Sequence, residues 1–236
     1  MSLRICILET DILRPELVEQ YHGYGKMFEQ LFARQPLLAQ FFTYNVVKGE
    51  YPTEADRFDA YLVTGSKADS FGGEPWILSL KKFLMRCYNR GDKLLGICFG
   101  HQLLALMLGG RTERAIQGWG VGVHDYKVDI QTEWMTPYSN NLALLVSHQD
   151  QVTLLPKGAA TVASSAFCPN AAYHIGGQVL CFQGHPEFSH DYSRALLDLR
   201  MDALGEEVHS AAVQSLKRDQ QGSLVGEWMM RFVACK

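Results

Sequence analysis

The sequence lacks several features that would place it in a specialised class of protein. No apolar run is long enough to cross a membrane. Acidic residues at Glu9 and Asp11 follow the first residue too closely for the apolar core of a secretion signal. A net charge of −3 gives no basic excess to attract nucleic acid or an anionic membrane. We therefore expect a cytoplasmic protein that acts on a small polar molecule.

Paired cysteines are also missing. The six cysteines form no CxxC pair, and no histidine stands beside them at the spacing of a metal site. A chain of 236 residues does not need disulfides to hold its fold together. We expect reduced thiols, no metal and no cofactor. The cysteines are Cys6, Cys87, Cys98, Cys168, Cys181 and Cys235.

What the chain does have is the pattern of an α/β protein. Short runs rich in Ile, Val and Leu alternate with longer amphipathic stretches, which predicts a mostly parallel central sheet flanked by helices. No repeat or linker interrupts the pattern, so residues 1–236 are expected to form a single domain. Two-residue alternation within 111–136 predicts antiparallel strands added to that sheet. The other expected strands are 4–8, 60–63, 93–97, 144–147, 161–164, 171–175 and 179–182, and the expected helices are 27–38, 75–90, 99–108, 191–203 and 224–233.

The sharpest motif is GICFGHQ at 96–102, between an expected strand and an expected helix. A nucleophilic residue flanked by glycines two positions away on each side is typical of a nucleophile elbow, a tight strand-to-helix turn. Cys98 would occupy its apex, where the positive end of the helix dipole favours a thiolate. The amide of Phe99 would point to the position where an oxyanion develops.

A second motif, GHPE at 184–187, directly follows an expected strand. Residues two apart in an extended segment point the same way, so Glu187 can accept a hydrogen bond from one ring nitrogen of His185. The other nitrogen is then free to face a thiol. Cys98, His185 and Glu187 are therefore predicted to form a catalytic triad.

These motifs resemble those of the class I, or triad, glutamine amidotransferases. The chain is especially similar to stand-alone proteins that resemble the amidotransferase domain of GMP synthetase. GICFGHQ and GHPE match the nucleophile motif and the His and Glu motif of that family. VTGS at 63–66 matches its oxyanion loop, and SHQDQV at 147–152 resembles its substrate-side segment. The resemblance covers nearly the whole chain.

The resemblance implies a flavodoxin-like fold and a specific reaction. Cys98 would attack the side-chain amide of glutamine, while the amides of Gly65 and Phe99 hold the oxyanion. A glutamyl thioester would then be hydrolysed to glutamate, with ammonia passed to an acceptor. The residues implied to lie near the substrate's amino and carboxylate groups are Gln102, His148, Gln149 and Asp150.

Three functions stay open from the sequence. The chain has no GxxxxGK[ST] nucleotide-binding loop, so either a separate synthetase subunit supplies the acceptor half or the protein acts alone. Acting alone, it would hydrolyse γ-glutamyl peptides or conjugates with the same triad. A non-catalytic redox sensor that uses Cys98 is a third possibility, although a sensor does not require an aligned histidine and glutamate.

Other histidines near the motifs are weaker candidates. His101 lies in the first helical turn after the elbow and is expected to be part of the scaffold. His148 is equally compatible with a substrate contact and with a strand-end hydrogen bond. His22 and Tyr24 could cover the pocket, but such loops are more often packed surface turns.

Overall fold

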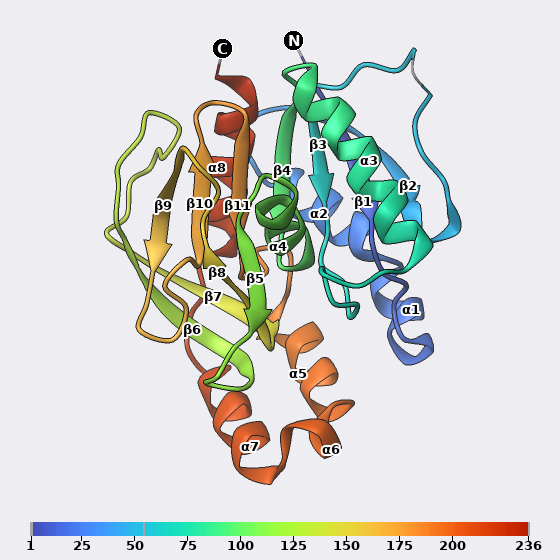
Figure 1. Cartoon of the computed structure of the whole chain (residues 1–236). Coiled ribbons are helices and arrows are strands. Elements are labelled where there is room, and N and C mark those ends of the chain that lie inside the picture. The colour runs from blue at the N-terminus through green and yellow to red at the C-terminus, as the bar shows by residue number, and fades with distance from the viewer. Residues whose placement is uncertain (1, 54, 236) are drawn as a thin grey trace.

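The computed structural model describes residues 2–53 and 55–235, which form a central nine-stranded sheet (Figure 1). Its strand order is β2-β1-β3-β4-β11-β10-β9-β6-β7. The first five strands in this order are parallel to one another, and the rest of the sheet is antiparallel. The strands are β1 (Leu3–Glu9), β2 (Ala39–Asn45), β3 (Ala60–Val63), β4 (Lys93–Ile97), β6 (Gly120–Val128), β7 (Asn141–His148), β9 (Ala159–Ser164), β10 (Ala172–Ile175) and β11 (Val179–Phe182).

Helices cover both faces of the parallel half. On β1, Ile5 and Ile7 face a core shared with α2 and α8, while Cys6 and Leu8 face a second core shared with α3 and α4. This alternation follows from the two-residue period of a strand. Burial on both faces explains why these strands are continuously apolar. The four helices are α2 (Tyr24–Phe32), α3 (Pro75–Asn89), α4 (Phe99–Met107) and α8 (Gly222–Ala234).

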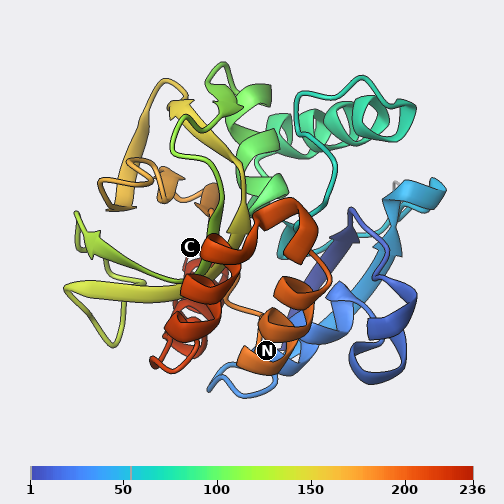
Figure 2. The same cartoon turned by 90° about the horizontal axis from the view of Figure 1, so that it is seen from below.

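Three further helices form an arm that projects from one end of the sheet (Figures 1 and 2). They are α5 (His190–Asp198), α6 (Met201–Leu204) and α7 (Glu206–Ser215). Helix α7 packs closely on β6, where a Cβ on Gly122 would come within 3.0 Å of the Ala212 carbonyl oxygen. The Ser215 hydroxyl also accepts a 2.9 Å hydrogen bond from the Val123 amide. The arm is therefore anchored to the antiparallel half of the sheet.

The fold confirms the α/β class and most predicted elements, with several corrections. The helix expected over 27–38 ends at Phe32 because Pro36 interrupts the helical pattern, and the aromatic run after it forms β2. The helix expected over 191–203 is divided into α5 and α6. Helix α7 and strand β8 (Asp150–Leu154) were not predicted from the sequence. Strand β8 pairs with β5 (Arg111–Arg114) in a separate two-stranded sheet. Two further short helices are α1 (Pro15–Tyr21) and η1 (Val46–Lys48).

No helix among the described residues combines the length and the apolar character needed to cross a bilayer. The same residues include no group of three His, Cys, Asp or Glu side chains placed to hold a metal ion.

Candidate active site

The candidate site lies where three adjacent parallel strands end. Gly65 follows β3, Cys98 follows β4 and His185 follows β11, and these strands are neighbours in the sheet. Carboxyl ends of parallel strands meet at one edge of a sheet, which is where ligands bind in open α/β folds. The topology therefore brings together the three motifs that are separated in the sequence.

Cys98 has the strained backbone expected of an elbow. Its φ is 50° and its ψ is −100°, and it is one of two non-glycine residues with positive φ in the described chain. Its amide donates a 2.9 Å hydrogen bond to the Phe182 carbonyl, which holds the turn against β11. A Cβ on Gly100 would lie 2.4 Å from the Val63 carbonyl oxygen, and one on Gly96 would lie 2.7 Å from the carbonyl carbon of Gly100. Glycine at both positions is therefore required for the turn to close.

His185 is held in place from three sides. Its Nδ1 lies 2.8 Å from Oε1 of Glu187, and its amide donates a 2.8 Å hydrogen bond to the Leu145 carbonyl. The Phe188 ring is stacked on the imidazole, with 3.9 Å between ring centroids and 10° between planes. The Cys98 side chain lies close enough to raise the pKa of His185, and both groups border Gly65. The imidazole thus has a fixed orientation between a thiol and a carboxylate.

The surroundings of His185 favour its protonated form. Burial opposes a charge on the imidazole, but the nearby charges of Glu187 and Cys98 outweigh burial and raise the pKa of His185 to about 10. Both His185 and Glu187 are less than 10 % exposed, so solvent screens this pair weakly. An imidazolium beside Cys98 stabilises a thiolate electrostatically.

Gly65 borders both groups. A Cβ there would lie 2.7 Å from Cε1 of His185 and 3.5 Å from Cβ of Cys98. The preceding peptide is fixed by Thr10, whose hydroxyl lies 3.0 Å from the Thr64 carbonyl oxygen and 2.9 Å from that of Gly65. Phe99 is the first residue of α4, so its N–H has no acceptor within the helix. The predicted oxyanion residues therefore flank the nucleophile.

A cavity of about 240 Å³ opens beside Cys98. Its walls come from the loop after β3, the elbow, β5, the β7–β8 turn and the junction of α5 and α6. Basic and acidic groups both line it, so it suits a zwitterionic ligand. The lining residues are Ser66, Lys67, Ala68, Asp69, Cys98, Gln102, Arg114, Trp119, Ser147, His148, Gln149, Asp150 and Arg200.

The four predicted substrate-side residues all line this cavity, but their side chains also have protein partners. Gln102 donates to the Asp150 carbonyl at 2.9 Å and to Gln183 at 3.1 Å. His148 uses Nδ1 on the same Asp150 carbonyl at 3.0 Å. Gln149 accepts from Arg114, whose Nε lies 2.8 Å from the Asp150 carboxylate. Gln102 and His148 thus support the β7–β8 turn as well as lining the cavity.

The weaker histidine candidates lie elsewhere. His101 is fully buried, its ring packs on Tyr173 at 5.0 Å, and burial lowers its pKa to about 3, so it is a neutral core residue. His22 is exposed at the end of α1. Tyr24 is buried; its ring stacks on Phe188, with 6.5 Å between centroids, and therefore supports the residue that contacts His185.

Sequence reasoning missed Arg200, Trp119 and Phe188. Arg200 reaches the cavity from the α5–α6 junction, where its guanidinium donates a 2.6 Å hydrogen bond to Ser147 and lies 5.6 Å from the Trp119 ring centroid. No motif marks these two residues, because they reach the cavity only through the packing of distant segments. Phe188 had a usable signal, since it directly follows GHPE.

Comparison with known proteins identifies the family of the chain. Residues 42–200 match the family described as glutamine amidotransferase class-I. Gamma-glutamyl peptidase 3 of Arabidopsis thaliana is 30 % identical over 210 residues, covering 85 % of this chain and 84 % of the relative. GMP synthase [glutamine-hydrolyzing] of Prochlorococcus marinus is 30 % identical over 171 residues, which cover 71 % of this chain and 31 % of that protein. The crystal structure of a glutamine amidotransferase from Thermotoga maritima superposes with a TM-score of 0.80 over both whole chains at 18 % identity.

The chain therefore belongs to the class I glutamine amidotransferase family, which is a family of enzymes. The match to the GMP synthase relative covers less than a third of that protein. The gamma-glutamyl peptidase relative, in contrast, matches along most of its length.

Proposed function

We propose that the protein hydrolyses the γ-glutamyl amide bond of a small substrate through a thioester on Cys98. The sulfur forms a bond to the γ-carbonyl carbon, and the C–N bond breaks as His185 gives its proton to the leaving nitrogen. Water then attacks the thioester while His185 takes up a proton. The C–S bond then breaks, and the second proton of that water passes from the new carboxyl group through solvent to the released amine. Glutamate leaves with a γ-carboxylate, and the thiolate and imidazolium are restored.

The proposed roles follow from the geometry. Glu187 orients the imidazole and stabilises its charge, and the stacked Phe188 ring limits its rotation. The amides of Gly65 and Phe99 are proposed to stabilise the oxyanion, because both residues flank Cys98 at the edge of the cavity. Each group acts from a fixed position, so little reorganisation accompanies the reaction.

The observation that carries this proposal is the Cys98, His185 and Glu187 arrangement beside a cavity that contains both charges. Turnover of glutamine and of γ-glutamyl dipeptides by the purified protein tests it, with Cys98→Ala as the inactive variant. A trapped glutamyl adduct on Cys98, seen by intact-protein mass spectrometry, would support the thioester. Turnover that survives Cys98→Ala would refute the proposed nucleophile.

A γ-glutamyl peptide is favoured over free glutamine by Arg200. This half-buried side chain lines the cavity and has no carboxylate partner within 4 Å among residues 2–53 and 55–235. A peptide substrate carries a carboxylate beyond the scissile bond, which glutamine lacks, and arginine binds carboxylates well. The match to gamma-glutamyl peptidase 3, which covers 84 % of that protein, supports the same choice.

Arg200→Gln tests this preference against a control from the same arm. A hydrogen bond to a charged group contributes about 1.5–3 kcal/mol, so the variant should lose about 10- to 100-fold in kcat/KM for γ-glutamylglycine. Glutamine turnover should fall much less. Arg194→Gln is the matched control, since Arg194 is exposed on α5 and pairs with Asp198. Equal losses of kcat/KM for both substrates would mean that Arg200 binds the glutamyl part that the two substrates share.

The alternative is that a synthetase subunit receives the ammonia. The GMP synthase relative motivates this possibility, because only 31 % of that protein is covered. Copurification from the native host, followed by the substrate comparison, tests it. Recovery of a stable partner that raises glutaminase activity, together with poor γ-glutamyl peptide turnover, would favour the amidotransferase function.

A further inference from the structure

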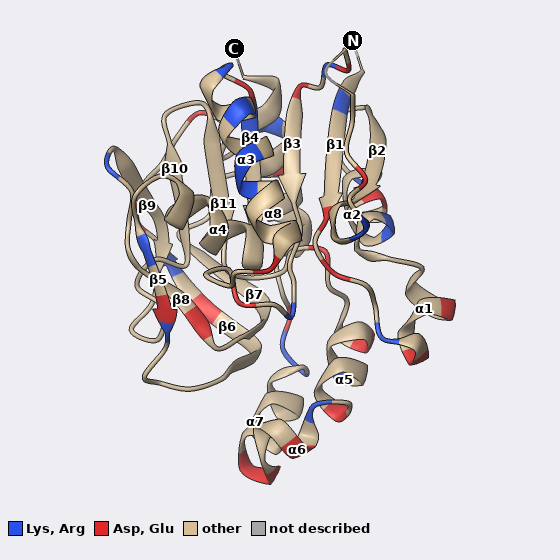
Figure 3. Cartoon of the chain, turned by 45° about the vertical axis from the view of Figure 1, so that its right-hand side comes forward, with Lys and Arg blue, Asp and Glu red and all other residues tan. Residues whose placement is uncertain are grey.

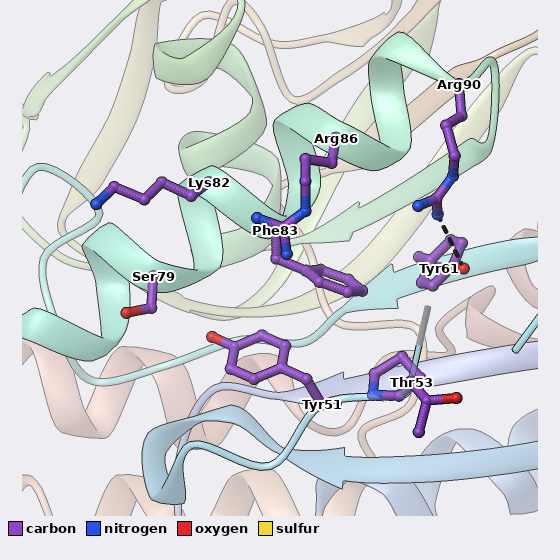
Figure 4. A pocket seen from close by; sticks show the side chains of 9 residues that line it. Tyr51, Thr53, Tyr61, Ser79, Lys82, Phe83, Arg86 and Arg90 are labelled. Atoms are coloured by element: carbon purple, nitrogen blue, oxygen red, sulfur yellow. Dashed lines mark hydrogen bonds between the residues drawn. The ribbon is translucent and has the colours of Figure 1, made fainter. Parts of the chain in front are cut away.

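A second cavity, separate from the candidate active site, lies between α3 and the segment that leads into β3 (Figure 4). Its volume is about 310 Å³, within the range of small-ligand pockets. No residue lines both this cavity and the one beside Cys98. We call it the α3 cavity. The proposed hydrolysis uses none of the residues that line it.

Aromatic rings form one part of its wall. The Phe83 ring lies 5.1 Å from that of Tyr51 and 5.7 Å from that of Tyr61, measured between centroids. Tyr61 comes from β3, Phe83 from α3 and Tyr51 from the segment after η1, so three separate elements converge here. Such a cluster provides flat apolar surface for a planar ligand.

Cations form the other part. Lys82 and Arg86 are four residues apart on one side of α3, and Arg90 caps the end of the same helix after another four residues. Figure 3 shows the basic segments of this helix, which contains no acidic residue. Arg90 pairs with Asp92 and also donates to the Tyr61 hydroxyl at 3.3 Å. Across residues 2–53 and 55–235, neither Lys82 nor Arg86 has a carboxylate within 4 Å.

Arg86 connects the two parts of the wall. Its guanidinium carbon lies 5.7 Å from the Phe83 ring centroid, and Figure 4 shows the side chain reaching toward that ring. Burial raises the pKa of Tyr51, and the positive charge of Arg86 opposes that rise, so the charge is felt on the other side of the cavity. A ligand lying against Tyr51 and Phe83 would therefore contact both an aromatic ring and the Arg86 guanidinium.

We propose that the α3 cavity binds a small anion that carries an aromatic ring, of the nucleoside monophosphate class. The ring would pack against Tyr51 and Phe83, and the phosphate would accept hydrogen bonds from Arg86 and Lys82. Neither half suffices alone. An anion without a ring leaves the aromatic wall uncovered, and a ring without an anion leaves Lys82 and Arg86 with no carboxylate partner among residues 2–53 and 55–235.

Calorimetric titration with adenosine 5′-monophosphate, adenosine and inorganic phosphate tests the proposal. The monophosphate should bind at least 10-fold more tightly than either fragment. Binding should persist after Cys98 has been alkylated, because the two cavities share no residue. Loss of binding on alkylation would place the nucleotide in the active-site cavity and overturn the proposal.

Variants separate the contribution of the basic side chains from that of the aromatic wall. Arg86→Gln should weaken monophosphate binding at least 10-fold and leave adenosine binding unchanged, whereas Tyr51→Ala should weaken both. Tyr51→Leu, which keeps the apolar packing, serves if the alanine variant unfolds. Lys157→Gln is the charge-matched control, because Lys157 is exposed and outside the cavity. Equal weakening by the control, or phosphate binding as tight as the monophosphate, would show that only general surface charge is involved.

Discussion

Alkylation by iodoacetamide should select Cys98 among the six cysteines. The reagent reacts with thiolates, so the fraction of each thiol that is ionised sets its rate along with access. An ordinary thiol, with a pKa of about 8.5, is about 10 % ionised at pH 7.5. Cys98 lines the candidate active-site cavity beside His185, whose pKa the nearby charges of Glu187 and Cys98 raise to about 10 against the effect of burial.

Four of the other cysteines should react slowly because burial raises their pKa values. Burial raises the pKa of Cys87 to about 11, so about 0.03 % is ionised at pH 7.5, roughly 300-fold less than an ordinary thiol. Burial raises the pKa of Cys168 and of Cys181 to about 12, which lowers the ionised fraction a further 10-fold. Cys6 is shifted higher still by burial. Cys87 and Cys168 are also fully buried, so the reagent has no access to either side chain.

Cys235 is therefore the single real competitor, since it is partly exposed. Peptide mapping after brief labelling at pH 7.5 measures both rates, and Cys235→Ser removes the competing signal. Glutamine or γ-glutamylglycine should slow labelling of Cys98 and leave Cys235 unchanged. Labelling of Cys98 no faster than Cys235, or a lack of protection, would show that the resting thiol is not activated.

Three further outcomes are expected. Gly65→Ala places a methyl group 2.7 Å from Cε1 of His185, so kcat should fall about 100-fold with little change in melting temperature. A normal kcat would contradict this close contact. Glu187→Gln should slow turnover of γ-glutamylglycine but retain more activity than Cys98→Ala, and equal complete loss with intact folds would refute an orienting role. The pKa of His185 is about 10 in the folded protein and about 6.5 in the unfolded chain. The protonated imidazole therefore stabilises the fold fully below about pH 6.5, and this stabilisation is lost as the pH rises through about 10. Urea unfolding under reductant should therefore show a smaller loss of stability between pH 6.5 and 9.5 for His185→Gln than for the parent, whereas identical losses would mean that the imidazolium is not stabilised.

The predictable parts of the molecule are those with local signals. Strands buried on both faces are continuously apolar, and the elbow is specified within seven residues by two glycines around Cys98. The strand β2 escaped prediction because its aromatic run follows directly on an amphipathic helix. Helix α7 escaped because its packing depends on Gly122, more than eighty residues earlier in the chain.

Only some of the residues that line the cavity beside Cys98 could be predicted from the sequence. Residues carried by motifs, such as Gln102 and His148, could be placed near Cys98 from the sequence. Arg200 and Trp119 could not, because their approach depends on how the arm of α5 to α7 packs against the antiparallel strands. A single sequence contains no local pattern for such a contact.

The close backbone contacts around the elbow have a consequence for how this enzyme can diversify. With Gly100 against Val63 and Gly96 against Gly100, the nucleophile and the neighbouring loop form one block that admits no added side chain. Arg114 and Arg200, on the other side of the cavity, are carried by β5 and the helical arm, whose side chains can be exchanged without moving that block. The arm is therefore the natural target for redesigning selectivity, because its side chains can change while the block that carries Cys98 stays in place.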